Sequence, residues 1–224
     1  MHYDWNFKIF LPYTHAFMRG LAVTLELSIV SSLVGTVIGF VLGILFRIKW
    51  IARILIPIND IVRAVPMLVL MFFFYYFPYQ ELFPWMKPLS AFGSAMMALT
   101  VAQAAFTAEI VRAAVDGVSQ KLILGGRALG LRESTIWQYI IIPDVMRQIM
   151  PSLIAFYIGN IKLSSIASVI GAEDVVFVAR EAASNTFRSL EVWVIVALIY
   201  ALLVLPLSYL SRKFERSAWL TNRT

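Results

Sequence analysis

The sequence has no cysteine and only two histidines, His2 and His15, which lie near its start. The absence of cysteine excludes disulfide bonds and thiolate metal ligands, and two histidines at one end give no basis for a histidine-based metal centre. Charged residues are also scarce, at 14% of 224 residues, whereas an ordinary soluble domain has about 25%. We therefore expect neither a metal site nor a soluble domain.

Two recognisable motifs are missing as well. No phosphate-binding loop of the form Gly-x4-Gly-Lys-Ser/Thr occurs, so any ATP hydrolysis must belong to another polypeptide, and we expect no cofactor bound by this chain. Residues 1–19 lack the basic start, apolar middle and small-residue cleavage site of a signal peptide. Their aromatic residues predict a helix that lies at the membrane interface and stays on the mature chain.

Apolar residues dominate what remains. The chain is 60% hydrophobic with a mean hydropathy of +0.80, which indicates an integral membrane protein. We predict an all-α membrane protein with about five transmembrane helices, each near the roughly 20 residues that cross a bilayer. The second is expected to be kinked or interrupted, because it contains Pro57 and Pro66. The predicted spans are 21–46, a segment within 54–79, 91–111, 149–171 and 192–210.

The net charge of +6 does not indicate nucleic-acid binding, because the basic residues fall between the apolar runs rather than on one basic face. If five spans alternate, most basic residues outside the spans share one side of the membrane. The positive-inside rule then places the N-terminus outside and the C-terminus in the cytoplasm. The basic side holds Arg47, Lys49, Arg53, Arg112, Lys121, Arg127, Arg132, Arg147, Arg212, Lys213, Arg216 and Arg223, and the other side holds Lys8, Arg19, Lys87, Arg180 and Arg188.

The segment 118–147, between the third and fourth spans, carries a helix–turn–helix pattern. Residues 121–129 suit a short helix, Gly130 suits its left-handed cap, and residues 133–139 can begin a second helix. Four leucines stand among charges outside the bilayer. The pattern predicts a docking element for another protein, with a loop folded against its own bundle as the alternative. The leucines are Leu122, Leu124, Leu129 and Leu131.

The stretch "LGGRALGLRESTIWQYIIIP", residues 124–143, resembles the cytoplasmic signature of bacterial ABC importer permeases. That signature is Glu-Ala-Ala, three residues, Gly, nine residues, Ile, any residue, Leu, Pro. The spacing matches throughout, but Leu replaces the Glu and Gly replaces both Ala. The matching positions are Leu124, Gly125, Gly126, Gly130, Ile140, Ile142 and Pro143.

Five further stretches resemble the polar amino-acid branch of that family in collinear order, so the resemblance covers nearly the whole chain. They are "GLAVTLELSIVSSLVGTVIG", "IVRAVPMLVLMFFFYYFP", "AEIVRAAVDGV", "IKLSSIASVIGAEDV" and "TFRSLEVWVIVALIY".

The resemblance implies a single permease domain over residues 1–224, in the bacterial inner membrane, that imports polar amino acids by alternating access. It also implies a second permease subunit, two ATPase subunits that bind ATP and Mg, and a periplasmic or lipid-anchored substrate-binding protein. We expect a different permease chain as the partner, because this chain departs from the Glu-Ala-Ala signature, while a homodimer remains open. The implied docking residues are Leu122, Leu124, Gly125, Gly126, Leu129, Gly130, Leu131 and Pro143.

Charges inside spans are costly and usually face a protein interior or an aqueous cavity. Asp60 and Arg63, three residues apart, could pair on one helical face, with internal stabilisation and substrate contact equally open. Lys162 could meet a substrate carboxylate or pair with Glu109 or with an acid of the partner, and we favour a pair. The candidate pathway or gating residues are Asp60, Arg63, Pro66, Glu109, Lys162, Ser164 and Ser165.

The hydroxyls of Ser164 and Ser165 are expected to bond backbone carbonyls rather than substrate. Small residues recur every four positions in the first span, which predicts close helix packing. The segment 171–188 carries charges of both signs and could form a helix over the pathway mouth, as a solvated connector or as a contact for the binding protein. The small residues are Ser31, Gly35, Gly39 and Gly43.

Two other classes of function compete with an importer subunit. A secondary transporter normally contains two related halves in one chain, and no internal repeat is found here. A membrane scaffold that only recruits a soluble partner would not need charges within its second and fourth spans. The importer interpretation is therefore preferred.

Overall fold

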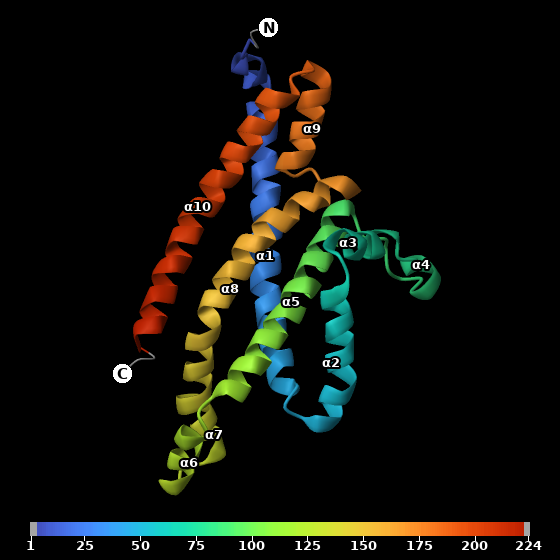
Figure 1. Cartoon of the computed structure of the whole chain (residues 1–224). Coiled ribbons are helices and arrows are strands. Elements are labelled where there is room, and N and C mark those ends of the chain that lie inside the picture. Colours follow the sequence, from blue (N-terminus) through green and yellow to red (C-terminus); the bar gives the residue numbers. More distant parts are fainter. Residues whose placement is uncertain (1–3, 222–224) are drawn as a thin grey trace.

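The computed structural model describes residues 4–221, which form helices and connecting turns with no strand among them (Figure 1). The elements in chain order are η1 (Phe7–Tyr13), α1 (Thr14–Leu45), α2 (Lys49–Ala64), α3 (Met67–Tyr76), α4 (Tyr79–Leu82), α5 (Ala91–Gly117), α6 (Gln120–Ala128), α7 (Glu133–Ile136), η2 (Trp137–Ile141), α8 (Ile142–Ser164), η3 (Ser165–Ile170), α9 (Val175–Thr186) and α10 (Ser189–Thr221).

Four continuous helical stretches are long and apolar enough to cross a membrane, and a fifth is broken. The prediction of about five spans is therefore confirmed. The connections 46–48 and 118–132 lie at one end of the bundle, whereas α9 and the described N-terminus lie at the other (Figure 1). The basic connections therefore lie at the same end of the bundle, as the sequence predicted. That this end faces the cytoplasm stays a prediction. The four continuous stretches cover Phe7–Leu45, Ala91–Gly117, Glu133–Ile170 and Ser189–Arg212.

The second span is broken at only one of its two prolines. The predicted interruption of this span is confirmed at Pro66, whereas Pro57 lies inside α2 and does not end it. The chain bends by 106° between α2 and α3, where Val65 is extended and Pro66 precedes the first turn of α3. An extended residue before proline relieves the clash with the proline ring, which explains why the turn falls at Val65.

The N-terminal boundary also differs from the prediction. Residues 14–19 belong to the continuous helix α1 and not to a separate interfacial helix. Among the described residues η1 precedes it, and Phe10 of η1 is buried against α9 and α10, in a cluster with Val178 and Val192. Residues 1–3 of the predicted interfacial segment lie outside the described residues.

Close contact between α1 and α5 forms the centre of the bundle. Gly35, Gly39 and Gly43 all face α5, and a Cβ atom on Gly39 would overlap the carbonyl oxygen of Ala104. A Cβ atom on Gly35 would lie 2.6–2.8 Å from atoms of Gln103 and Thr100, and one on Gly43 would lie 2.7 Å from atoms of Ala108 and Val111. The predicted packing role of these small residues is confirmed, since glycine lets helices approach where lipid offers no hydrophobic drive.

Replacing Gly39 with valine should separate α1 from α5. We expect a loss of about 1–3 kcal/mol, because the new side chain meets backbone that cannot yield. The measurement is the melting temperature of the purified protein in detergent. Gly159→Ala is the matched control, since its added Cβ meets nothing within 4 Å, and it should melt no lower than the wild type. Equal melting of the Gly39→Val variant and the wild type would contradict this packing.

The segment 171–188 contains a packed helix and not a solvated connector. Val175, Ala179 and Ala182 of α9 are fully buried against α1 and α10. The carboxylate of Asp174 caps this helix, accepting a hydrogen bond from the Phe177 amide at 2.8 Å. Asp174 is itself buried, and desolvation raises the pKa of its carboxyl group from 3.8 to about 6, against the lowering effect of the amides and Arg180.

The raised pKa of Asp174 gives the fold a pH dependence with a definite sign. The folded state holds the proton more tightly than the unfolded state, so the contribution of Asp174 to stability is fully present below about pH 4 and is lost as the pH rises through about 6. A shift of this size corresponds to about 2–3 kcal/mol. Asp174→Asn retains a capping oxygen and should lose this decline between pH 4.5 and 7, as measured by thermal melting in detergent. If the melting temperature of Asp174→Asn fell with pH as much as that of the wild type, titratable groups other than Asp174 would be responsible for the decline.

Candidate functional site

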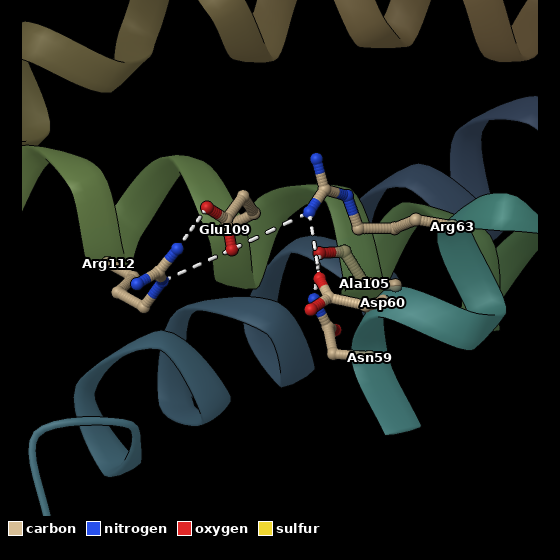
Figure 2. A network of polar contacts seen from close by, with 6 residues as sticks. All are labelled: Asn59, Asp60, Arg63, Ala105, Glu109 and Arg112. Atoms are coloured by element: carbon tan, nitrogen blue, oxygen red, sulfur yellow. Dashed lines mark hydrogen bonds and ion pairs between the residues drawn. The ribbon is translucent and has the colours of Figure 1, made fainter. Parts of the chain in front are cut away.

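Four charged side chains form one network between α2 and α5, which we call the α2–α5 ion network (Figure 2). Glu109 lies at its centre. Its Oε1 is 2.5 Å from Nη2 of Arg112, and its Oε2 is 3.6 Å from Nη1 of Arg63. The same Nη1 is 3.3 Å from Oδ1 of Asp60, which confirms the predicted pair on α2. Positive and negative charges in the network are equal in number.

The network is partly enclosed. The side chain of Glu109 is 21% exposed and that of Arg63 32% exposed. The Arg63 guanidinium stacks 5.7 Å from the ring centroid of Phe106, and its Nε is buried without a hydrogen-bond partner. Beside it, the buried Asn59 donates a hydrogen bond to the carbonyl oxygen of Ala105 at 3.2 Å. These contacts fix α2 on α5 through polar groups as well as apolar ones.

The network lies close to the helix–turn–helix segment along α5. Glu109 and Arg112 are on the last two to three turns of α5, which ends at Gly117. One further turn along, Asp116 pairs with Arg47 of the α1–α2 connection. Only two residues separate the end of α5 from α6, which begins at Gln120, so α6 is joined closely to the helix that carries Glu109.

The helix–turn–helix segment has the predicted form. Gly130 follows α6 with φ +73°, in the left-handed region that glycine favours, and the Leu131 amide donates to the Gly126 carbonyl at 3.1 Å. Gly126 is buried, and an added Cβ would lie 3.1 Å from Ile140 and 3.2 Å from Ile136, whereas Gly125 faces open space. The packing of α6 against α7 and η2 therefore explains why residue 126 is a glycine, but it does not explain the glycine at 125.

All four leucines of this segment project from the surface. The exposed fraction is 51% for Leu122, 57% for Leu124, 81% for Leu129 and 39% for Leu131. Arg127 and Glu133 brace the turn with an ion pair of 2.7 Å. The alternative of a loop folded against its own bundle does not describe these leucines, because their apolar surface is not covered by this chain.

The second helix begins at Glu133, as predicted, and runs on into the fourth span. From Glu133 the chain continues through α7, one π-helical stretch (η2) and α8 without a break. Pro143 lies in the first turn of α8, where a missing amide is tolerated. Pro143 therefore marks the end of the π-helical stretch and not the end of a helix.

Lys162 is not joined to the network. The structure gives Glu109 two arginine partners, so a pair of Lys162 with Glu109 is wrong. Lys162 is exposed, and among the described residues no carboxylate lies within ion-pair distance of it. Ser164 and Ser165 donate to the carbonyls of Ile161 and Lys162 at 2.8 and 2.6 Å, as expected.

Several polar contacts were missed at the level of sequence. The buried Asn160 of α8 donates to the hydroxyls of Ser31 and Ser32 on α1 at 2.8 and 2.9 Å. Ser28 donates to Ser164 at 3.2 Å. The only available signal was an asparagine within an apolar span, which in a membrane usually bonds another helix. The i,i+3 spacing of Glu109 and Arg112 is a sequence signal that favours their pair.

Comparison with known proteins identifies the group. The sequence matches the family described as "Binding-protein-dependent transport system inner membrane component" over residues 35–219. The chain belongs to this family. It is 31% identical to the arginine transport system permease protein ArtQ of Bacillus subtilis (94% of this chain, 96% of that protein) and 31% identical to the glutamine transport system permease protein GlnP of Escherichia coli K12 (75% and 76%).

The fold agrees with this assignment. One chain of a solved structure, described as an amino acid ABC transporter with histidines, superposes on this chain with a TM-score of 0.84 and is 30% identical to it. The match covers 96% of this chain and all of the other. A chain of the MetNI methionine ABC transporter shares the fold at 21% identity, with a TM-score of 0.76. Among the described residues, no group of three or more His, Asp or Glu could hold a metal ion. The permease is a multi-pass membrane protein, and such subunits are not themselves enzymes.

Neutralising Glu109 should weaken the bundle at the α2–α5 ion network. Glu109→Gln leaves Arg63 and Arg112 without their shared carboxylate, and we expect a loss of about 2 kcal/mol, between the values for exposed and buried pairs. Thermal melting in detergent measures it. Glu133→Gln is the matched control, because it breaks a solvent-exposed pair and should change the melting temperature little. An equal change of melting temperature in the two variants would show that the α2–α5 ion network does not stabilise the bundle.

Proposed function

We propose that this chain is the transmembrane pathway subunit of an ATP-driven importer that carries polar amino acids across the bacterial inner membrane by alternating access. The observation that carries the proposal is helix α6, with its exposed leucines and its left-handed Gly130 turn, joined by short connections to two membrane-spanning helices. The family match and the names of the relatives support the transport class and the substrate class.

The exposed leucines fit a groove on an ATPase subunit. They provide an apolar docking face, while the bracing pair of Arg127 and Glu133 is satisfied within the chain. Leu124 stands where the family signature has a carboxylate, so docking relies on apolar burial more than on ionic contacts. The ATPase supplies the nucleotide and Mg sites, for which this chain has no phosphate-binding loop.

Movement passes from the docking segment through two helices. Closure of the ATPases would displace α6, which pulls on α5 at one end and on the continuous helix from Glu133 to Ser164 at the other. The α2–α5 ion network makes α2 follow α5, and the bend at Pro66 allows α2 to move against α3. This transmission favours a rigid-body exchange between inward- and outward-facing states.

The remaining parts of the importer come from other polypeptides. Two permease subunits would enclose the pathway, two ATPases would bind on the cytoplasmic side at residues 118–147, and a periplasmic or lipid-anchored binding protein would dock at the end formed by α9. A different permease chain with the full Glu-Ala-Ala signature is the favoured partner. Its charged signature would complement the softer docking helix of this chain, because Gly125 and Gly126 each lower helix propensity by about 1 kcal/mol.

Gly130→Val should uncouple ATP hydrolysis from uptake or release the ATPase. Valine is strained at φ +73°, so α6 can no longer keep its direction relative to α7. Gly93→Ala is the matched control, because Gly93 is in the first turn of α5, far from the docking segment, and its added Cβ would meet only contacts of 3.4 Å or more. The measurements are amino-acid uptake and ATP hydrolysis by the complete complex in liposomes. Normal coupled transport by Gly130→Val would show that this turn is not the coupling element.

A further inference from the structure

An apolar groove of about 220 Å³ lies between α1 and α2, with α5 as its floor. Its lining offers almost no polar surface and no charged group. Asn59 is one of its few polar residues, and its amide is already bonded to the Ala105 carbonyl. The groove therefore presents hydrocarbon surface and leaves no polar group waiting for a ligand. The aliphatic residues that form most of its walls and floor are Ile38, Leu42, Leu55, Ile58, Val62 and Val101.

The groove results from the way in which two helices are fixed to α5. Gly39 and Gly43 bring α1 against one side of α5. Asn59 and Arg63 hold α2 to α5 through a hydrogen bond and the α2–α5 ion network. Both helices are thus anchored to α5 rather than to each other, which leaves a wedge-shaped space between them that the aliphatic side chains of this chain do not fill.

The rim of the groove faces the hydrocarbon of the bilayer. Ile38 on one wall is 43% exposed and Ile58 on the other is 52% exposed. The charged residues Lys49, Arg53 and Asp60 recur on a face of α2 that is turned away from the groove. The groove therefore opens to lipid and not to an aqueous cavity. From the rim, exposed apolar residues continue along both helices, as Val37 and Val41 on α1 and Ile54 and Ile61 on α2.

The start of α2 fixes the depth of the groove in the membrane. Lys49, Trp50 and Arg53 are exposed in its first two turns, and basic and tryptophan side chains are typical anchors at headgroup level. Leu55 and Val62 lie about 9 and 20 Å beyond Lys49 along a helix that rises about 1.5 Å per residue. The hydrocarbon core is about 30 Å thick, so the groove lies at the depth of the acyl chains in the leaflet on the docking side.

We propose that this groove binds one acyl chain of a phospholipid from that leaflet, and that the lipid stays with the permease on purification. A chain on the outer surface of the bundle touches protein on one side only. In the groove it contacts α1, α2 and α5 together, and these dispersion contacts hold it more firmly. The bound chain completes the packing between α1 and α2. The inference concerns the lipid-facing side of the bundle and does not depend on the proposed import.

Photochemical cross-linking in liposomes tests the site. The complete importer is placed in vesicles of phosphatidylethanolamine and phosphatidylglycerol with a trace of phosphatidylcholine that carries a photoreactive acyl chain. After irradiation, mass spectrometry should find the label at the groove residues Leu42, Leu55 and Val62, and also at the exposed Ile61. Phospholipid analysis of the detergent-washed complex should find a retained phospholipid on each copy of this chain.

A substitution on the floor of the groove should displace the lipid. Val101→Phe places a larger side chain in the groove and should lower labelling of Leu55 and Val62 at least fivefold, with Ile61 unchanged. The washed complex should also lose its retained phospholipid. Val37→Phe is the matched control, because Val37 is 66% exposed on α1 and does not line the groove, and it should leave both measurements unchanged.

Three results would overturn the inference. Labelling of Ile61 without any groove residue in the wild type would show that the groove holds no acyl chain, whether or not Val101→Phe assembles. Equal labelling of Leu55 and Val62 in Val101→Phe and Val37→Phe would show that the label enters from the outer surface. This chain has no cysteine, so Ile58→Cys provides a single thiol in it. If a short bifunctional reagent joined that thiol to the second permease subunit, a partner helix would fill the groove.

Discussion

The energetic cost of charge inside a bilayer governs the organisation of this permease. Glu109 is held by two arginines from different helices, and this shared carboxylate connects the broken second span to α5. Where charges are satisfied in this way they act as structural links between helices. Where one is left over, at Lys162, the same cost indicates contact with water, substrate or another subunit.

A second constraint is the close approach of α1 to α5. It depends on glycines at every fourth position, and it leaves α5 fixed along much of its length. The α2–α5 ion network adds α2 to this central unit, so the elements that we expect to move against it are α3 and the helix from Glu133. The bend at Val65 and Pro66 and the turn at Gly130 sit at the ends of these elements. A rigid centre with two hinged elements is compatible with the rigid-body motion that we propose for this subunit.

The sequence predicted those features that depend on local chemistry. Apolar length predicted the spans, the spacing of small residues predicted the α1–α5 contact, and Gly130 predicted the left-handed turn. It did not distinguish Pro57 from Pro66, because a proline inside a helix is tolerated or not according to the packing around it. The partners of Glu109 and the bonds of Asn160 were missed, since a linear pattern does not show which helix faces which.

The central claim is that this chain couples membrane transport to ATP hydrolysis. The most direct measurement is ATP hydrolysis by the purified permease in liposomes with its co-purifying subunits, with and without substrate-loaded binding protein outside. The account predicts that the loaded binding protein stimulates hydrolysis and that labelled amino acid accumulates inside in the same preparation. Hydrolysis that is insensitive to the loaded binding protein, or a purified permease that retains no ATPase, would contradict it.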